Sequence, residues 1–188
     1  MLKNRLIPNI ILDNGNIVQS INFKHTNVIG NAITAVDFFN SWVVDEIIVL
    51  DVSRTDENRE MFHKIINGLS KRCFVPLTVG GWIKNLDDIR QLLNEGADKI
   101  SINTEAVKNP NLIKTSSNTF GSQCIVVSID VKKNKNNIHE VYIDRGRKNT
   151  GMDIVEWSKE VEALGAGEIL LTSIDNDGSL KGYDIDLL

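Results

Sequence analysis

One carboxylate in this sequence stands where an enzyme could use it. Asp130 closes the run VVSID (126–130), whose other residues are mostly apolar and β-branched, as in a buried strand. In a barrel of alternating strands and helices, a carboxylate at the carboxyl end of a strand faces the active site. There it can move protons as a general acid or base. The alternative is an aspartate that caps a helix or forms an ion pair.

A second kind of chemistry is indicated by small and polar residues after two other apolar runs. Gly80 and Gly81 follow one run, and Asn103 and Thr104 follow the next. Glycines leave the backbone open, and N–H and hydroxyl groups at the start of a helix suit a phosphate group. Such groups could therefore bind a phosphate.

Metal and thiol chemistry is not indicated. The chain has three histidines and two cysteines, and none of them has the spacing of a metal site. We expect no metal and no cofactor. We also expect Cys73 and Cys124 to be buried free thiols, with a disulfide or a reactive thiol as the alternative.

The overall charge and hydropathy argue against two further classes of protein: those that bind nucleic acid or anionic membranes, and those that span a membrane. A net charge of −4 predicts no general attraction to nucleic acid or to an anionic membrane. The sequence has no run of about 18 apolar residues and no basic segment before an apolar one. We therefore expect a cytoplasmic protein with no signal peptide and no membrane span.

Strand-like and helix-like segments alternate along the chain. The expected strands are 5–12, 46–52, 74–80, 98–103, 124–131 and 168–174. The expected helices are 31–43, 56–70, 85–95, 105–117 and 152–164. A hairpin is expected at 131–144. Near-continuous apolar strands that alternate with helices predict a parallel sheet covered by helices.

The segment after the first strand favours a barrel. DNGNIV (13–18) is typical of a hairpin, whereas a doubly wound sheet usually has a glycine-rich turn there. We expect a (β/α)8 barrel with about six of its eight βα units present, so that residues 1–188 form a single, incomplete domain of a C-terminally shortened chain. A faint repeat between 45–54 and 167–178 is typical of duplicated half-barrels, although buried parallel strands also look alike.

Specific strings then indicate a family. They are LTVGGWI (77–83), GADKISINTEAVKNP (96–110), FGSQCIVVSID (120–130), RKNTG (147–151) and GAGEILLTSIDNDG (165–178). Over its whole length the chain resembles the cyclase subunit of imidazole glycerol phosphate synthase, a lyase of histidine biosynthesis. The resemblance implies a heterodimer with a glutaminase subunit, whose ammonia passes through the barrel to a substrate with two phosphate groups. The implied products are imidazole glycerol phosphate and aminoimidazole carboxamide ribotide.

The resemblance also implies roles for individual residues. It makes Asp130 catalytic, and it adds Asp177 and Gly178 to the phosphate-binding residues named above. It implies a charged ring, the ammonia gate, at the strand starts: Arg5, Glu46, Lys99 and Glu168. Charges of both signs at one end of a barrel make physical sense as a paired network, because isolated buried charges are costly. Ordinary strand-start charges are the alternative.

Other positions depart from the family. Ile11 stands where the family has a second catalytic aspartate, Gln19 where it has a lysine, and Trp82 where it has a third glycine. Asp13 could replace the missing acid, but a role in the DNG turn is the simpler interpretation. The departures favour two alternatives: a paralogue that channels ammonia to amidate a surface-polysaccharide sugar, or a non-catalytic subunit that binds the glutaminase.

Overall fold

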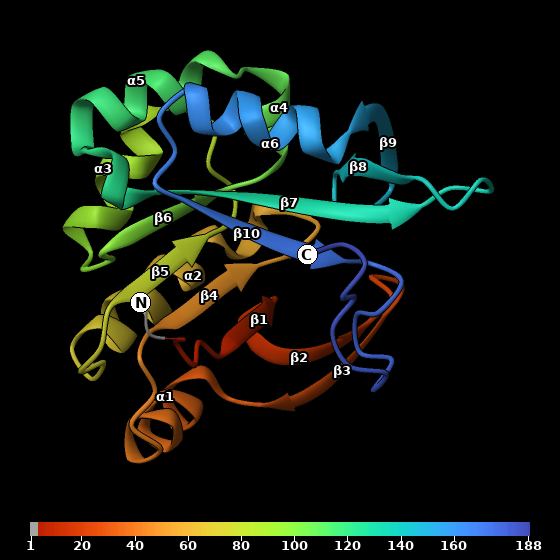
Figure 1. The fold of residues 1–188 in the computed structure, drawn as a ribbon. Helices are drawn as coiled ribbons and strands as arrows, with labels where there is room; N and C mark the ends of the chain where they lie inside the picture. The colour runs from red at the N-terminus through yellow and green to blue at the C-terminus, as the bar shows by residue number, and fades with distance from the viewer. Residues whose placement is uncertain (1–3) are drawn as a thin grey trace. The chain divides into compact units, whose positions relative to one another are not determined.

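The predicted strands and helices occur in the predicted order, with further strands after β1 and β7 (Figure 1). The structure is a computed structural model, and it describes residues 4–188. The chain divides into two units, which are described separately. Unit 1 comprises Met1–Gln19 and Asn27–Ser101, and unit 2 comprises Ser20–Thr26 and Ile102–Leu188. The prediction of one domain over 1–188 stays a prediction.

Unit 1 is built on parallel strands. They are β1 (Asn9–Asp13), β4 (Ile47–Asp51), β5 (Leu77–Gly80) and β6 (Lys99–Ile102). Ile10 pairs with Val49, Val49 with Val79, and Val79 with Ile100, so that one row of apolar side chains crosses the sheet. Each of the four is at most 3% exposed. The predicted apolar strands therefore form a buried parallel sheet.

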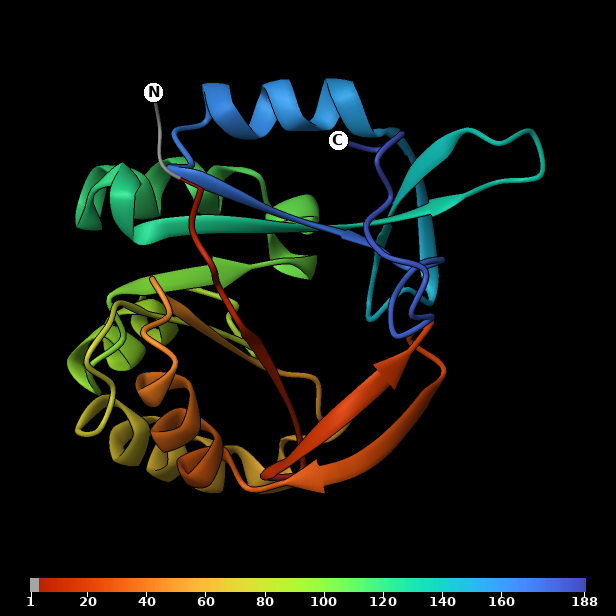
Figure 2. The ribbon, with the colours of Figure 1, turned by 60° about the horizontal axis from the view of Figure 1, so that its bottom comes forward.

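Helices cover the strands of unit 1 (Figure 2). They are α1 (Ala32–Ser41), the 3-10 turn η1 (Asp56–Asn58), α2 (Arg59–Ser70) and α3 (Leu86–Asn94). Their buried faces include Val36, Ile66 and Ile89. The predicted start of α3 is confirmed, because the Asn85 side chain accepts hydrogen bonds from the N–H groups of Asp87 and Asp88 in a capping box.

The hairpin predicted after the first strand is confirmed. β2 (Asn16–Ile21) runs antiparallel to β1, with Asp13 opposite Asn16. The intervening Asn14 and Gly15 have φ angles of 49° and 80°, which asparagine and glycine adopt in a tight hairpin turn. A further strand, β3 (His25–Gly30), follows and was not predicted, because all of its residues are exposed and lack an apolar pattern.

Unit 2 combines a parallel strand pair with a meander. β7 (Ile125–Lys133) is parallel to β10 (Glu168–Ser173) and antiparallel to β8 (His139–Ile143), which pairs in turn with β9 (Lys148–Asp153). The helices are α4 (Thr104–Lys108), α5 (Asn111–Phe120) and α6 (Ile154–Ala163), and the 3-10 turn η2 is Ser122–Cys124. The β7–β8 pairing confirms the hairpin predicted at 131–144.

Several elements differ from prediction. The strands expected from residues 5 and 74 begin only at Asn9 and Leu77. The helix expected at 105–117 is two helices, because Pro110 lacks an N–H and keeps Asn109 out of the helical conformation, at φ −139° and ψ 77°. The strand expected to end at 131 continues to Lys133, because it pairs with β8. β9 was missed because its sequence, KNTGMD, is largely polar. Within the described residues, no helix is long and apolar enough to cross a membrane.

Candidate functional site

Asp130 is held by a neighbouring amide inside unit 2. It lies on β7, opposite Thr172 of β10 and Tyr142 of β8, and is 7% exposed. The side-chain nitrogen of Asn103 donates to Oδ2 of Asp130 at 2.9 Å and to the backbone oxygen of Ser128 at 3.1 Å. The carboxyl group is therefore buried and oriented.

This environment changes the acidity of Asp130. Burial raises its pKa, the Asn103 hydrogen bond lowers it, and the negative charge of Asp177 raises it again, so that the pKa rises to about 7. A carboxyl group with such a pKa exchanges protons readily near neutral pH, which is what general acid–base catalysis requires.

The position of Asp130 within its strand differs from prediction. We expected it to end the strand, but β7 continues to Lys133. The reason is the hairpin with β8, which extends the strand beyond its parallel partner. The parallel pairing with β10 ends one residue later, at Val131 and Ser173, so Asp130 still lies near the carboxyl end of the parallel region.

Asn103 and Thr104 are engaged with other protein groups. The Thr104 hydroxyl donates to Oδ1 of Asn103 at 3.3 Å and accepts from the N–H of Asp144 at 3.0 Å. Together with its bonds to Asp130 and Ser128, this gives the Asn103 side chain an orienting role that the sequence interpretation missed. A polar residue directly after a buried strand was the available signal. Phosphate binding by this pair stays a prediction.

Asp177 and Gly178 lie on a loop that contacts the segment 20–23. Oδ2 of Asp177 accepts from the Ser20 hydroxyl at 2.7 Å, and the N–H of Asn22 donates to the Asp177 carbonyl at 2.9 Å. Gly178 has φ +62°, and a Cβ there would lie 3.0 Å from Cα of Ile21. Glycine is thus needed for a close backbone contact that sequence reasoning did not foresee.

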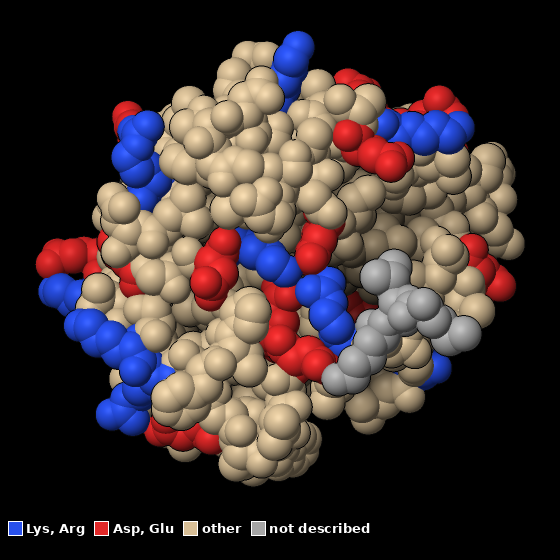
Figure 3. Space-filling view, turned by 60° about the vertical axis from the view of Figure 1, so that its left-hand side comes forward, with Lys and Arg blue, Asp and Glu red and all other residues tan. Residues whose placement is uncertain are grey.

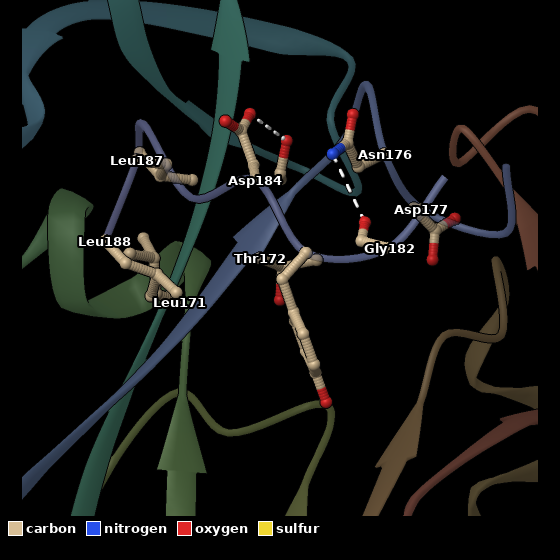
Figure 4. A pocket seen from close by; sticks show the side chains of 10 residues that line it. Leu171, Thr172, Asn176, Asp177, Gly182, Asp184, Leu187 and Leu188 are labelled. Atoms are coloured by element: carbon tan, nitrogen blue, oxygen red, sulfur yellow. Dashed lines mark hydrogen bonds between the residues drawn. The ribbon is translucent and has the colours of Figure 1, made fainter. Parts of the chain in front are cut away.

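A cavity of about 340 Å³ lies beside β10 (Figure 4). Its lining residues all belong to unit 2: Leu171, Thr172, Ser173, Asn176, Asp177, Gly182, Tyr183, Asp184, Leu187 and Leu188. Asp184 accepts from the Ser173 hydroxyl at 2.9 Å. Burial opposes ionisation of Asp184, but this hydrogen bond and the charge of Lys133 outweigh it, so the pKa lies below its ordinary value.

Gly80 and Gly81 have a packing role in unit 1. A Cβ on Gly80 would lie 2.7 Å from Cδ2 of Leu50, and one on Gly81 would lie 2.8 Å from the carbonyl oxygen of Asp51. Gly81 also has φ +122°. The next residue, Trp82, has φ +60°, a region that favours glycine. Close strand packing explains both glycines, and their binding of phosphate stays a prediction.

Most of the predicted gate is assembled around one buried carboxylate. Glu46 is 2% exposed, and its Oε2 lies 3.0 Å from Nη1 of Arg5 and 2.7 Å from Nζ of Lys99. The hydroxyl of Thr78 donates to the other oxygen, Oε1, at 2.5 Å. Sequence reasoning missed Thr78, whose signal was one polar residue inside an apolar strand. The other gate residue, Glu168, begins β10 in unit 2.

These pairs satisfy a charge that would otherwise be expensive to bury. Acidic and basic side chains meet at the centre of the face shown in Figure 3, with uncharged residues around them. The structure thus brings together Arg5, Glu46 and Lys99 as predicted. The role of all four gate residues in ammonia passage stays a prediction.

The first strand offers no second acid at its centre. Ile11 pairs with Leu50 in the sheet. Asp13 is the last residue of β1, and its Oδ1 accepts from the side-chain nitrogen of Asn14 at 2.9 Å, which is the turn role expected for it. Gln19 is exposed on β2.

Neither cysteine is in a disulfide bond. Cys73 and Cys124 are free, but both are partly exposed, so the expectation of buried thiols was wrong. Cys73 lies between α2 and β5, and Cys124 ends η2 directly before β7. Among the residues that the structure describes, no group of three or more histidine, cysteine, aspartate or glutamate side chains could hold a metal ion.

Comparison with known proteins identifies the family. The family model described as "Histidine biosynthesis protein" matches residues 5–188. The chain belongs to this family. Because the family is a (β/α)8 barrel, the predicted fold class is confirmed.

Several relatives are similar over the whole chain. A Vibrio vulnificus protein named "Putative imidazole glycerol phosphate synthase subunit hisF2" is 50% identical over 188 residues, which are 100% of this chain and 69% of the relative. "Imidazole glycerol phosphate synthase subunit HisF" of Clostridium botulinum is 46% identical over 188 residues, 100% of this chain and 74% of the relative. The protein of the same name from Lactococcus lactis is 44% identical over 189 residues, 100% and 73% respectively.

Proposed function

We propose that this chain acts as a cyclase subunit of the imidazole glycerol phosphate synthase type. It would use ammonia from a glutaminase (HisH-like) subunit to form imidazole glycerol phosphate and aminoimidazole carboxamide ribotide in histidine biosynthesis, in the cytoplasm. The relatives bear the name of that synthase's subunit. The observation that carries the proposal is Asp130, a buried carboxyl group with a pKa of about 7, held by Asn103.

Ring closure needs proton transfers to and from nitrogen and oxygen atoms of the substrate. A carboxyl group that is half ionised near neutral pH can both donate and accept a proton. Asn103 holds one carboxyl oxygen of Asp130 in a fixed direction. This fixes the direction in which Asp130 can exchange a proton with the substrate. We assign the phosphate groups to Gly80, Gly81, Asn103, Thr104, Asp177 and Gly178, as the resemblance implies.

Ammonia delivery is supported by the network around Glu46. Arg5, Lys99 and Thr78 converge on this carboxylate from three separate segments of unit 1. A network of this kind, at the strand starts, suits a narrow passage lined by paired charges. We include Glu168 in it from the resemblance, and we propose that the glutaminase subunit docks at this end in a heterodimer.

A second candidate function is favoured by the departures from the family. Ile11 cannot carry a proton, and Trp82 holds a bulky side chain in a backbone conformation that favours glycine. Both changes suit a paralogue that passes ammonia to a different acceptor, such as a surface-polysaccharide sugar. A non-catalytic subunit that binds the glutaminase is the remaining alternative.

The test is cyclisation with ammonium salt and the bisphosphate substrate, without a glutaminase, in wild type, Asp130→Asn and Ile11→Asp. We expect turnover in wild type, loss of at least a hundredfold in Asp130→Asn, and faster turnover in Ile11→Asp. No turnover in either wild type or Ile11→Asp, with both proteins folded, would refute the cyclase proposal. Binding of a glutaminase by such an inactive protein would favour the alternatives.

A further inference from the structure

The turn between β8 and β9 contacts the start of α4 in unit 2. It covers residues 144–147 and leads into the string RKNTG, to which the proposed function gives no role. Asp144, Arg145 and Gly146 have φ angles of 55°, 58° and 71°. The side chain of Arg147 closes the turn, because its Nε donates to the carbonyl oxygen of Asp144 at 3.1 Å and its Nη2 to Oδ1 of Asp144 at 2.7 Å.

The turn determines how the Thr104 hydroxyl is used. The N–H of Asp144 donates to this hydroxyl at 3.0 Å. Because a backbone N–H can only donate, the hydroxyl oxygen accepts from it with a lone pair. The single hydroxyl proton is then directed to Oδ1 of Asn103, at 3.3 Å. A hydroxyl engaged in this way has no second proton to donate to a phosphate group.

The bond from Thr104 fixes which end of the Asn103 amide faces Asp130. An amide oxygen only accepts hydrogen bonds, and an amide nitrogen only donates them. With Oδ1 on Thr104, the nitrogen donates to Oδ2 of Asp130 at 2.9 Å and to the carbonyl oxygen of Ser128 at 3.1 Å. If the amide were turned over, its oxygen would face both of these acceptors, and Asp130 would lose a donor.

The position of Asn103 in the chain is a separate sign that its side chain serves Asp130. Asn103 is the N-cap residue of α4, where an asparagine side chain usually accepts from an N–H of the first turn. Asn31 and Asn85 make such bonds at the starts of α1 and α3. Asn103 makes none. Its amide is therefore used for Asp130, Ser128 and Thr104 in place of the helix cap.

We propose that Thr104, held by the turn between β8 and β9, is a positioning residue that orients the catalytic carboxyl group of Asp130 through Asn103. This inference rests on the proposed function in one respect, the use of Asp130 for proton transfer. It adds that the direction of proton transfer is set from the turn at residues 144–147.

Further titratable groups lie near Asp130. The negative charge of Asp177, on the loop after β10, raises the pKa of Asp130. Tyr142 of β8 lies opposite Asp130, and Nζ of Lys132 lies 6.0 Å from the centroid of the Tyr142 ring. The hydrogen bond from Asn103 lowers the pKa of Asp130. A change at Thr104 that leaves these other groups in place and frees the Asn103 amide should therefore raise this pKa.

The experiment measures the pKa of Asp130 in the substrate-free chain by carboxyl-carbon NMR, with the signal assigned from Asp130→Asn. Thr104→Val removes the hydroxyl at nearly constant size and should raise the pKa. Thr104→Ser keeps the hydroxyl and should restore the wild-type pKa. In turnover with ammonium salt, Thr104→Val should lower kcat at least about tenfold with KM nearly unchanged, because a misplaced catalytic group slows the reaction without weakening substrate binding.

Thr150 of β9 provides a matched control. Like Thr104 it is half-buried. Its hydroxyl donates to the carbonyl oxygen of Val141 at 2.7 Å and accepts from the N–H of Met152 at 3.1 Å. Thr150→Val therefore removes the same pair of bonds at a site that these bonds do not link to Asn103, and should leave the pKa of Asp130 and kcat unchanged. Thr104→Ala removes the hydroxyl in a second way if the valine variant does not fold.

An unchanged pKa of Asp130 in the folded variants without the hydroxyl, or a raised pKa that Thr104→Ser does not restore, would overturn the inference. So would a rise in KM at constant kcat and constant pKa, which would indicate direct contact of the hydroxyl with a substrate phosphate. With turnover in wild type, these results leave the cyclase function intact. A raised and restored pKa in a chain that shows no turnover supports the positioning role and counts against the cyclase function.

Discussion

Replacing Asp130 with asparagine should stabilise the folded protein at high pH while it abolishes turnover. The carboxyl group is buried, and its pKa rises from 3.8 to about 7. Its protonated form is therefore favoured in the folded state. The resulting stabilisation is fully present below the unfolded-state pKa and is lost as the pH rises through the folded-state pKa. Asparagine resembles the protonated carboxyl group in shape and carries no charge to bury.

The size of the effect follows from the shift. At about 1.4 kcal/mol per pKa unit, a rise from 3.8 to about 7 corresponds to a difference on the order of 4 kcal/mol between the pH extremes. The free energy of unfolding of Asp130→Asn, minus that of wild type, should thus increase by several kcal/mol between pH 4 and pH 8. Most of the increase should occur between about pH 4 and pH 7.

Urea denaturation at pH 4, 5, 6, 7 and 8 measures this difference. Asp186→Asn makes the same substitution at a side chain that is 88% exposed, and subtracting its effect removes the influence of losing an aspartate that is not buried. If the difference between Asp130→Asn and wild type were independent of pH after this correction, the reasoning about burial and the pKa of Asp130 would be wrong.

The remaining predictions concern the partners of the two buried carboxylates and one glycine. Asn103→Ala removes the hydrogen bond that lowers the pKa of Asp130, so the pKa read from the pH dependence of kcat/KM should rise. Thr78→Val removes a donor from buried Glu46 and should lower the free energy of unfolding by about 1–3 kcal/mol in denaturation. Gly81→Ala should lower it by at least about 1 kcal/mol, because the backbone at φ +122° disfavours a side chain and the Cβ site is occupied.

Conservative variants provide the controls. Thr78→Ser keeps the hydroxyl and should recover most of the stability lost in Thr78→Val. A Cβ on Gly30 meets no atom within 4 Å, so Gly30→Ala should cost far less than Gly81→Ala. If Thr78→Ser and Thr78→Val lost equal free energy of unfolding, the role assigned to the Thr78 hydroxyl would be wrong. Equal losses in Gly81→Ala and Gly30→Ala would likewise contradict the role assigned to Gly81. An unchanged pH profile in Asn103→Ala would contradict the role of Asn103.

Much of the fold was predictable because its signals are local. A β-branched apolar run such as IIVL in β4 forms a strand in almost any buried setting, and Asn85 caps α3 through atoms within three residues of it. The Asn14–Gly15 turn likewise follows from the φ angles that these two residues tolerate. Strand ends were less predictable, since β7 continues to Lys133 only because β8 pairs with it.

For the candidate site, the sequence by itself determined which groups are available: Asp130 after an apolar run, Glu46 and Lys99 at strand starts, and an isoleucine at position 11 in place of an acid. Only the tertiary structure decided what those groups do. The pKa of Asp130 depends on burial and on Asn103, and Glu46 accepts a hydrogen bond from Thr78, 32 residues away. The physical reason is that electrostatic energy depends on distance and on exclusion of water, and both are set by segments that are remote in sequence.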